Sequence, residues 1–143
     1  MATVTVSNQF KYEKGLGNVD FSSDTFKIAL MANGYTFDED AHGVWADVSA
    51  SEISTTGGYT AGGEALTVES AWVQDDTDDQ ADISWSDHTF TASGAAFDAI
   101  SGAIIYDDTH ASDLIVGAIM FDSDISVSDG NSLQLQDLGF DDV

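Results

Sequence analysis

Apolar residues occur along the chain in short runs, and the most distinctive stretch covers residues 101–121. Two apolar runs, 102–106 and 114–121, are continuous rather than alternating and are separated by the acidic segment 107–113. Continuous runs of this length, rich in β-branched residues and bounded by Asp and Gly, are typical of strands buried on both faces of a sheet. We therefore predict two neighbouring strands in the middle of a sheet, with the acidic segment as a surface tip.

The remaining apolar positions also predict β-structure. Residues 24–31 form a strand ended by Asn33-Gly34, and Ala81, Ile83 and Trp85 alternate with polar residues as in a half-solvated strand. Turn residues recur roughly every 8–12 positions, as in β-sandwiches. The sequence thus predicts an all-β fold, a β-sandwich or jelly roll of about eight strands. Further strands are expected at residues 64–73, 89–92, and 125–127 with 133–135, the last two as a hairpin.

Two segments differ from this pattern. Residues 38–55 are polar, with Trp45, Val48 and Ile53 at helical spacing, and predict a short helical or irregular insertion. Residues 1–14 alternate weakly and predict either a docking arm or an edge strand. Neither a linker nor an internal repeat interrupts the chain, so residues 1–143 are expected to form a single β domain.

Charge changes this picture most strongly. The formal net charge is −23, with only three basic residues, Lys11, Lys14 and Lys27, and no arginine. Three acids balance these lysines within the first 27 residues, so the whole net charge lies in residues 28–143. Self-repulsion of this size destabilises a compact state and is screened by salt. The composition indicates a halophilic or high-salt marine origin, with a merely acidic, soluble surface as the alternative. A nucleic-acid partner is excluded, because nothing would neutralise phosphates.

Several classes of chemistry are excluded by residues that the sequence lacks. Cysteine is absent, which removes disulfides, thiolate zinc sites and thiol nucleophiles. No run of eighteen apolar residues occurs, so no membrane partner is expected, and the first residues lack a signal-peptide pattern. His42, His88 and His110 lie far apart, and no nucleophile motif frames a Ser-His-Asp set. We therefore predict no catalytic residues and no cofactor.

One acidic cluster and three tryptophans are the remaining candidates for binding. The cluster is a weak candidate for Ca²⁺, since it lacks the glycine and terminal glutamate of an EF-hand, and a solvated turn is favoured. Trp45, Trp72 and Tyr59 could serve as stacking platforms in a carbohydrate-binding module, whereas Trp85 belongs to the predicted core. The four carboxylates of the acidic cluster are Asp75, Asp76, Asp78 and Asp79.

A longer series of residues, given at the end of this paragraph, resembles in its order and spacing a family of small virion structural proteins of tailed bacteriophages and related viruses. The resemblance runs from about residue 11 to residue 135 and implies a non-enzymatic virion component without cofactor or catalytic residues. It implies a head decoration or cement protein first, and a neck, tail or fibre component second. The series comprises residues 24–30, 35–36, His42, Trp45, 47–49, 52–54, 58–63, 85–86, 103–108, 114–115 and Phe121.

The N-terminal segment is the expected contact region of such a component. Residues 1–27 carry no net charge, so they are the part least repelled by other acidic proteins. The expected partners are other virion proteins, namely the major capsid protein or neck and tail proteins, and further copies of the chain in a homo-oligomer. Lys11 and Lys14 would pair with carboxylates of a neighbour. The interface candidates are Val4, Val6, Phe10, Lys11, Tyr12 and Lys14.

Overall fold

A computed structural model describes residues 4–142, and its secondary structure is dominated by strands. Its helical elements are short, and all ladders between its strands are antiparallel. The all-β prediction is confirmed. The elements are β1 (Thr5–Val6), α1 (Asn8–Gly15), β2 (Phe26–Ala32), α2 (Trp45–Val48), the 3-10 turn η1 (Ser49–Ser51), β3 (Glu64–Ala65), β4 (Val68–Asp75), β5 (Gln80–Trp85), β6 (His88–Thr91), β7 (Phe97–Asp107), β8 (Leu114–Val127), β9 (Ser132–Leu135) and β10 (Leu138–Asp142).

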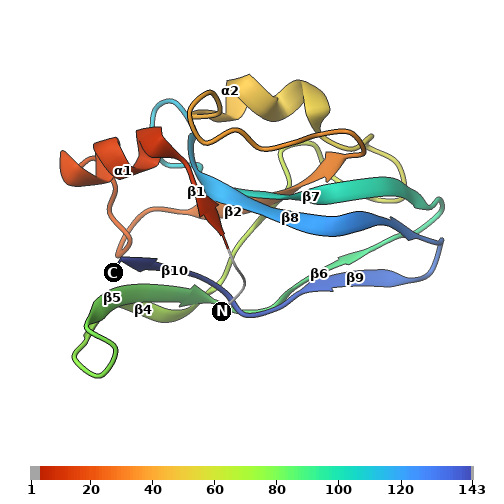
Figure 1. Ribbon diagram of the computed structural model, residues 1–143. Helices are drawn as coiled ribbons and strands as arrows, with labels where there is room; N and C mark the ends of the chain where they lie inside the picture. The colour runs from red at the N-terminus through yellow and green to blue at the C-terminus, as the bar shows by residue number, and fades with distance from the viewer. Residues whose placement is uncertain (1–3, 143) are drawn as a thin grey trace.

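A five-stranded sheet in the order β1-β8-β7-β2-β3 forms the centre of the molecule (Figure 1). Strands β7 and β8 pair with Ile104 opposite Ala118, and β2 pairs with the other side of β7. The predicted pair of neighbouring strands in the middle of a sheet is therefore confirmed. Two smaller sheets, β10-β5-β4 and β6-β9, lie on one side of the central sheet (Figure 1).

Both faces of the central sheet are covered. One face packs against the small sheets, and its core cluster includes Ile28, Ile105 and Val116. The opposite face carries Ile104 and Ile115 and lies beneath α2 and the segment around it (Figure 1). This double coverage is the physical reason that residues 102–106 of β7 and 114–121 of β8 are continuous apolar runs rather than alternating ones.

The smaller sheets follow the alternating pattern. Ile83 and Trp85 of β5 are buried between polar neighbours, as predicted. The insertion predicted around residues 38–55 contains α2 and η1, which is also as predicted. The sandwich or jelly-roll assignment stays a prediction.

One predicted pairing is wrong. A turn does occur between residues 128 and 131, but β8 and β9 leave it for different sheets. Residues 125–127 end β8 and pair with β7, whereas β9 pairs with β6. The backbone of Ala92 binds both Gly130 and Asn131 at the turn, so the chain leaves it alongside β6 instead of returning along β8.

Residues 4–15 are folded onto the domain, which supports the edge-strand alternative, and the docking role of this segment stays a prediction. Strand β1 is an edge strand paired with β8, and the Ser7 amide donates to Val116 O at 3.0 Å. Helix α1 follows, in a segment for which no helix was predicted, and Phe10 anchors it in the core. No helix within residues 4–142 is long and apolar enough to cross a membrane.

Candidate functional site

A hydrogen-bond network joins several residues of the series identified in the sequence. The Tyr59 hydroxyl donates to Glu52 Oε1 at 2.7 Å and accepts the Leu30 amide at 3.0 Å. The same Glu52 oxygen accepts the Gly62 amide at 2.7 Å. The segment that contains Gly57 and Gly58 is thereby fixed to β2, although its composition alone favours a flexible loop.

Tyr106 extends the network from β7. Its hydroxyl donates to Gly62 O at 2.6 Å, and the Trp45 ring stacks on its ring with centroids 4.8 Å apart and an interplanar angle of 16°. The glycine-rich segment, β7 and α2 therefore meet at one place on the face of the sheet that α2 covers. We call Trp45, Glu52, Tyr59, Gly62 and Tyr106 the loop-docking network.

Close backbone approach explains why a glycine occupies position 63. A Cβ on Gly63 would overlap the Ile28 carbonyl oxygen, and the residue has a φ of +75°. Here the chain passes directly against β2 before β3 begins. Only glycine satisfies both the left-handed conformation and the contact.

Burial keeps the phenols of the network protonated. Burial is the main cause that raises the pKa of Tyr59 far above its ordinary value, and Glu52 adds to the effect. Burial likewise raises the pKa of Tyr106, with further contributions from Asp108, Asp113 and Glu52. Both hydroxyls thus act as permanent hydrogen-bond donors that hold the loop.

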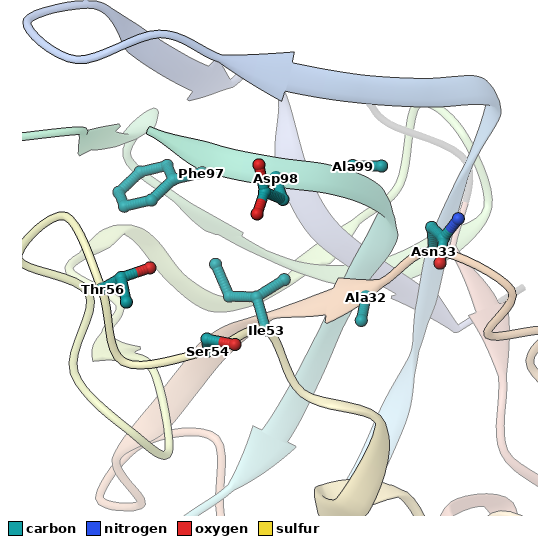
Figure 2. Close-up of a pocket in the computed structure, with 8 residues that line it drawn as sticks. All are labelled: Ala32, Asn33, Ile53, Ser54, Thr56, Phe97, Asp98 and Ala99. Atoms are coloured by element: carbon teal, nitrogen blue, oxygen red, sulfur yellow. The ribbon is translucent and has the colours of Figure 1, made fainter. Parts of the chain in front are cut away.

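A hollow of about 250 Å³ lies beside this segment, between the end of β2 and the start of β7 (Figure 2). Figure 2 shows the apolar Ile53 and Phe97 with the hydroxyls of Ser54 and Thr56 and the carboxylate of Asp98 around it. Phe97 and Ile53 are buried core residues. The hollow thus lies over the core and has a polar rim.

The structure separates the predicted interface residues into two groups. Lys11 and Tyr12 are exposed on α1, whereas Phe10 is 0% exposed and packs on Phe140 with ring centroids 5.3 Å apart. Phe10 is therefore a core residue and not a contact residue. Val4 and Val6, which flank Thr5 at the edge strand, are half-buried.

The two lysines of α1 also have partners within the chain. Lys14 forms an ion pair with Asp142, and its pairing with a neighbour stays a prediction. Lys11 Nζ donates to Asn8 Oδ1 at 3.2 Å.

The weak Ca²⁺ candidates lie at the turn between β4 and β5. Asp75 Oδ1 accepts the amides of Thr77 and Asp78 at 2.8 and 3.3 Å, and Asp76 accepts a hydrogen bond from the Gln74 side chain. Asp75 thus caps the turn on which Asp79 has a φ of +55°. Within residues 4–142, no three His, Asp or Glu side chains are grouped so that they could hold a metal ion.

The histidines lie at three separate places. His42 Nδ1 accepts the Asp38 amide at 3.0 Å, and His88 Nε2 lies 2.7 Å from Glu64 Oε2. His110 Nδ1 accepts the Ser112 amide at 3.2 Å. His42 and His110 therefore support their own local turns, whereas His88 connects β6 to β3.

The tryptophans serve packing to different degrees. Trp85 is buried, as predicted, and Trp45 is engaged by Tyr106. Trp72 is half-buried and stacks on Phe21 with centroids 4.6 Å apart. Trp72 also lines a second hollow of about 320 Å³, whose charged lining residues are Lys14, Asp20 and Asp142.

The sequence did not indicate the burial of Asp107. Residues 107–113 were expected to form a surface tip, but Asp107 is 0% exposed at the end of β7. Its Oδ1 accepts the amides of Thr109 and His110 at 2.9 and 3.1 Å, which closes the turn that follows. The Asp-x-Thr spacing is the local signal that could have identified this capping role.

The chain has no match among known protein-family models, curated proteins or solved structures.

Proposed function

We propose that this chain is a non-enzymatic structural component of a virus particle, in the first place a head decoration or cement protein that binds the capsid in many copies. The observation that carries the proposal is the loop-docking network. The network consists of residues from the series that resembles virion proteins, and these residues hold the glycine-rich segment to the sheet. Because the residues that carry the resemblance hold a loop to the sheet, they support a structural role for the protein.

Helix α1 supports a docking role and suggests where contact occurs. Tyr12 of α1 and Leu16, the residue that caps its C-terminus, are 63% and 58% exposed and stand one helical turn apart. Lys11 is exposed beside them, on a chain whose net charge is −23. An apolar pair next to a lysine is suited to an acidic partner surface with apolar spots, such as another protein of the same particle. We call Tyr12 and Leu16 the α1 pair.

Multivalency would make such a small surface sufficient. Each contact buries modest area, but many copies on a symmetric particle convert weak single contacts into a stable shell. A neck, tail or fibre position would use the same surface in fewer copies. Copy number therefore distinguishes the head from the other positions.

The experiment is quantitative mass spectrometry of purified particles of the virus that encodes the chain. A head decoration protein is expected at a stoichiometry comparable to that of the capsid subunit, and a neck or tail component at a few copies per particle. Absence from purified particles would overturn the proposal.

A rebinding assay tests the docking surface separately. Particles stripped of the chain are mixed with the purified wild type or with variants in molar salt. Tyr12→Ser with Leu16→Ser is expected to weaken rebinding at least tenfold. The matched control, Val68→Ser with Val73→Ser, removes two other exposed apolar side chains and is expected to rebind like the wild type. Equal rebinding by both double variants would exclude the α1 pair.

A carbohydrate-binding module is the second candidate, favoured by one observation. Trp72 lines the hollow of about 320 Å³ together with the carboxylates of Asp20 and Asp142. Aromatic rings with a few convergent polar groups are typical of small-molecule sites. Binding on a glycan array in molar salt that is lost in Trp72→Ala would favour this function, and an array without binding would remove it.

A further inference from the structure

Asp107 is a buried carboxyl group with one unsatisfied oxygen. Its Oδ1 accepts two backbone amides, but its Oδ2 is buried without a hydrogen-bond partner. A buried carboxylate oxygen without a donor is costly. A proton or another positive charge on that oxygen would remove the cost.

Asp24 stands two residues before Phe26 and is the nearest acid in sequence to the strand end that pairs with Asp107; its Oδ2 accepts the Asp20 amide at 2.7 Å. Phe26 pairs with Asp107 in the β2–β7 ladder, so the residues just before β2 lie beside the loop that follows β7. The Asp108 amide donates to Thr25 O at 2.9 Å, and the Thr25 amide donates to Thr109 Oγ1 at 2.8 Å. The turn at residues 20–25 and the loop at residues 107–113 are therefore held together by their backbones.

The electrostatics of Asp107 agree with this geometry. Burial is the main cause that raises the pKa of Asp107 to about 6, and the carboxylate of Asp24 raises it further. The amides of His110 and Thr109 act in the opposite direction. A negative charge near a buried carboxyl group favours the protonated form of that group.

We propose that Asp107 and Asp24 form a proton-operated clasp. In the closed state, the protonated Asp107 carboxyl donates a hydrogen bond to the Asp24 carboxylate and joins the turn at residues 20–25 to the loop at residues 107–113. Ionisation of Asp107 places two negative charges in the clasp and loosens it. This inference does not rest on the virion role.

Contacts around the clasp connect it to neighbouring elements. Lys27 Nζ lies 3.1 Å from Asp108 Oδ1 and forms a separate, exposed ion pair beside it. On the opposite side, Leu114 of β8 pairs with Asp107, and Asp113 O accepts the Trp45 amide at 2.8 Å. The acidic loop thus links the clasp to α2, and loosening should reach that helix.

Hydrogen exchange measured by NMR tests the clasp on the full chain in molar salt. Protection of the Thr25 and Asp108 amides, corrected for intrinsic exchange, is compared at about pH 5 and about pH 7.5. In the wild type, protection is expected to fall at least tenfold at the higher pH. Asp107→Asn keeps a neutral hydrogen-bond donor toward Asp24 and is expected to keep its protection at both values. Asp108→Asn, the control for the neighbouring ion pair, should behave like the wild type.

Three results would overturn the proposal. One is an equal pH dependence in the wild type and Asp107→Asn. Another is loss of the pH dependence in Asp108→Asn, which would assign it to the Lys27 ion pair. The third is restored protection on adding CaCl2 to the wild type at the higher pH, which would make the pair a cation site. A carboxyl ¹³C titration of the wild type is expected to place the Asp107 midpoint near 6, and a midpoint near 4 would also refute the clasp.

Discussion

Replacing Gly63 by alanine tests directly whether the glycine-rich segment is docked on the sheet. The added methyl group would overlap the Ile28 carbonyl oxygen, so the backbone at residue 63 must move away from β2. That movement breaks the short β2–β3 pairing at Ile28 and Glu64 and pulls on Gly62, which the network holds at both its N–H and its C=O.

The expected cost follows from two contributions. A positive φ costs an alanine about 1–2 kcal/mol relative to glycine. Two or three weakened hydrogen bonds, at about 1 kcal/mol each, add a further 2–3 kcal/mol. We therefore expect Gly63→Ala to lower the free energy of unfolding by about 4 kcal/mol.

Gly130→Ala is the matched control. Gly130 also has a positive φ, +85°, but a methyl group there meets no atom within 4 Å. Gly130→Ala should therefore lower the free energy of unfolding by the conformational contribution alone, about 1–2 kcal/mol. The difference between the two variants isolates the contact with β2.

Urea denaturation in fixed molar salt, followed by tryptophan fluorescence, gives both values. The denaturant slope should stay unchanged, since the same surface is exposed on unfolding. If Gly63→Ala and Gly130→Ala are equally stable, the segment is not held against β2, and the reasoning on the loop-docking network fails.

Three further predictions concern the network, the clasp and the net charge. Tyr59→Phe leaves the Leu30 amide without its acceptor and should lower the free energy of unfolding by about 2–3 kcal/mol, whereas Tyr12→Phe on the exposed face of α1 should change it by less than about 0.5 kcal/mol. The folded-state pKa of Asp107 lies above its ordinary 3.8, so its ionisation lowers the free energy of unfolding as the pH rises from about 4 to about 6. Asp107→Asn should therefore be more stable than the wild type by about 2–3 kcal/mol at pH 7.5, and this gain should shrink toward pH 5. An equal gain at both pH values would contradict this reasoning. The melting temperature should rise steeply from low to molar salt, because salt screens the repulsion within a chain of net charge −23. A melting temperature independent of salt would refute the halophilic interpretation.

The hydrophobic pattern was sufficient for the central strands, because their burial on both faces makes them continuous apolar runs. Helix α1 escaped prediction for the opposite reason. Only Phe10 of its residues is buried, so no apolar periodicity marks the helix, and its position depends on aromatic contacts with Phe21 and Phe140. The turn after β8 was expected from its residues, but the partners of the strands on either side are set by tertiary contacts.

The candidate site was accessible to sequence reasoning only in part. Tyr59 was identifiable as the one large side chain within a glycine-rich segment, yet its partners Glu52 and Leu30 are distant in sequence. Asp107 gave no local sign of burial, because it stands among other acids that are solvated. Burial of a single carboxyl group in an acidic loop depends on the strand register, which the composition does not encode.

We propose above all that this chain is a structural component of a virus particle. The decisive experiment is cryo-electron microscopy of the purified particles. We expect density that fits the central sheet and its two smaller sheets, repeated over the capsid surface with α1 facing a neighbouring subunit. A well-resolved particle without such density at the head, neck or tail would refute the proposal.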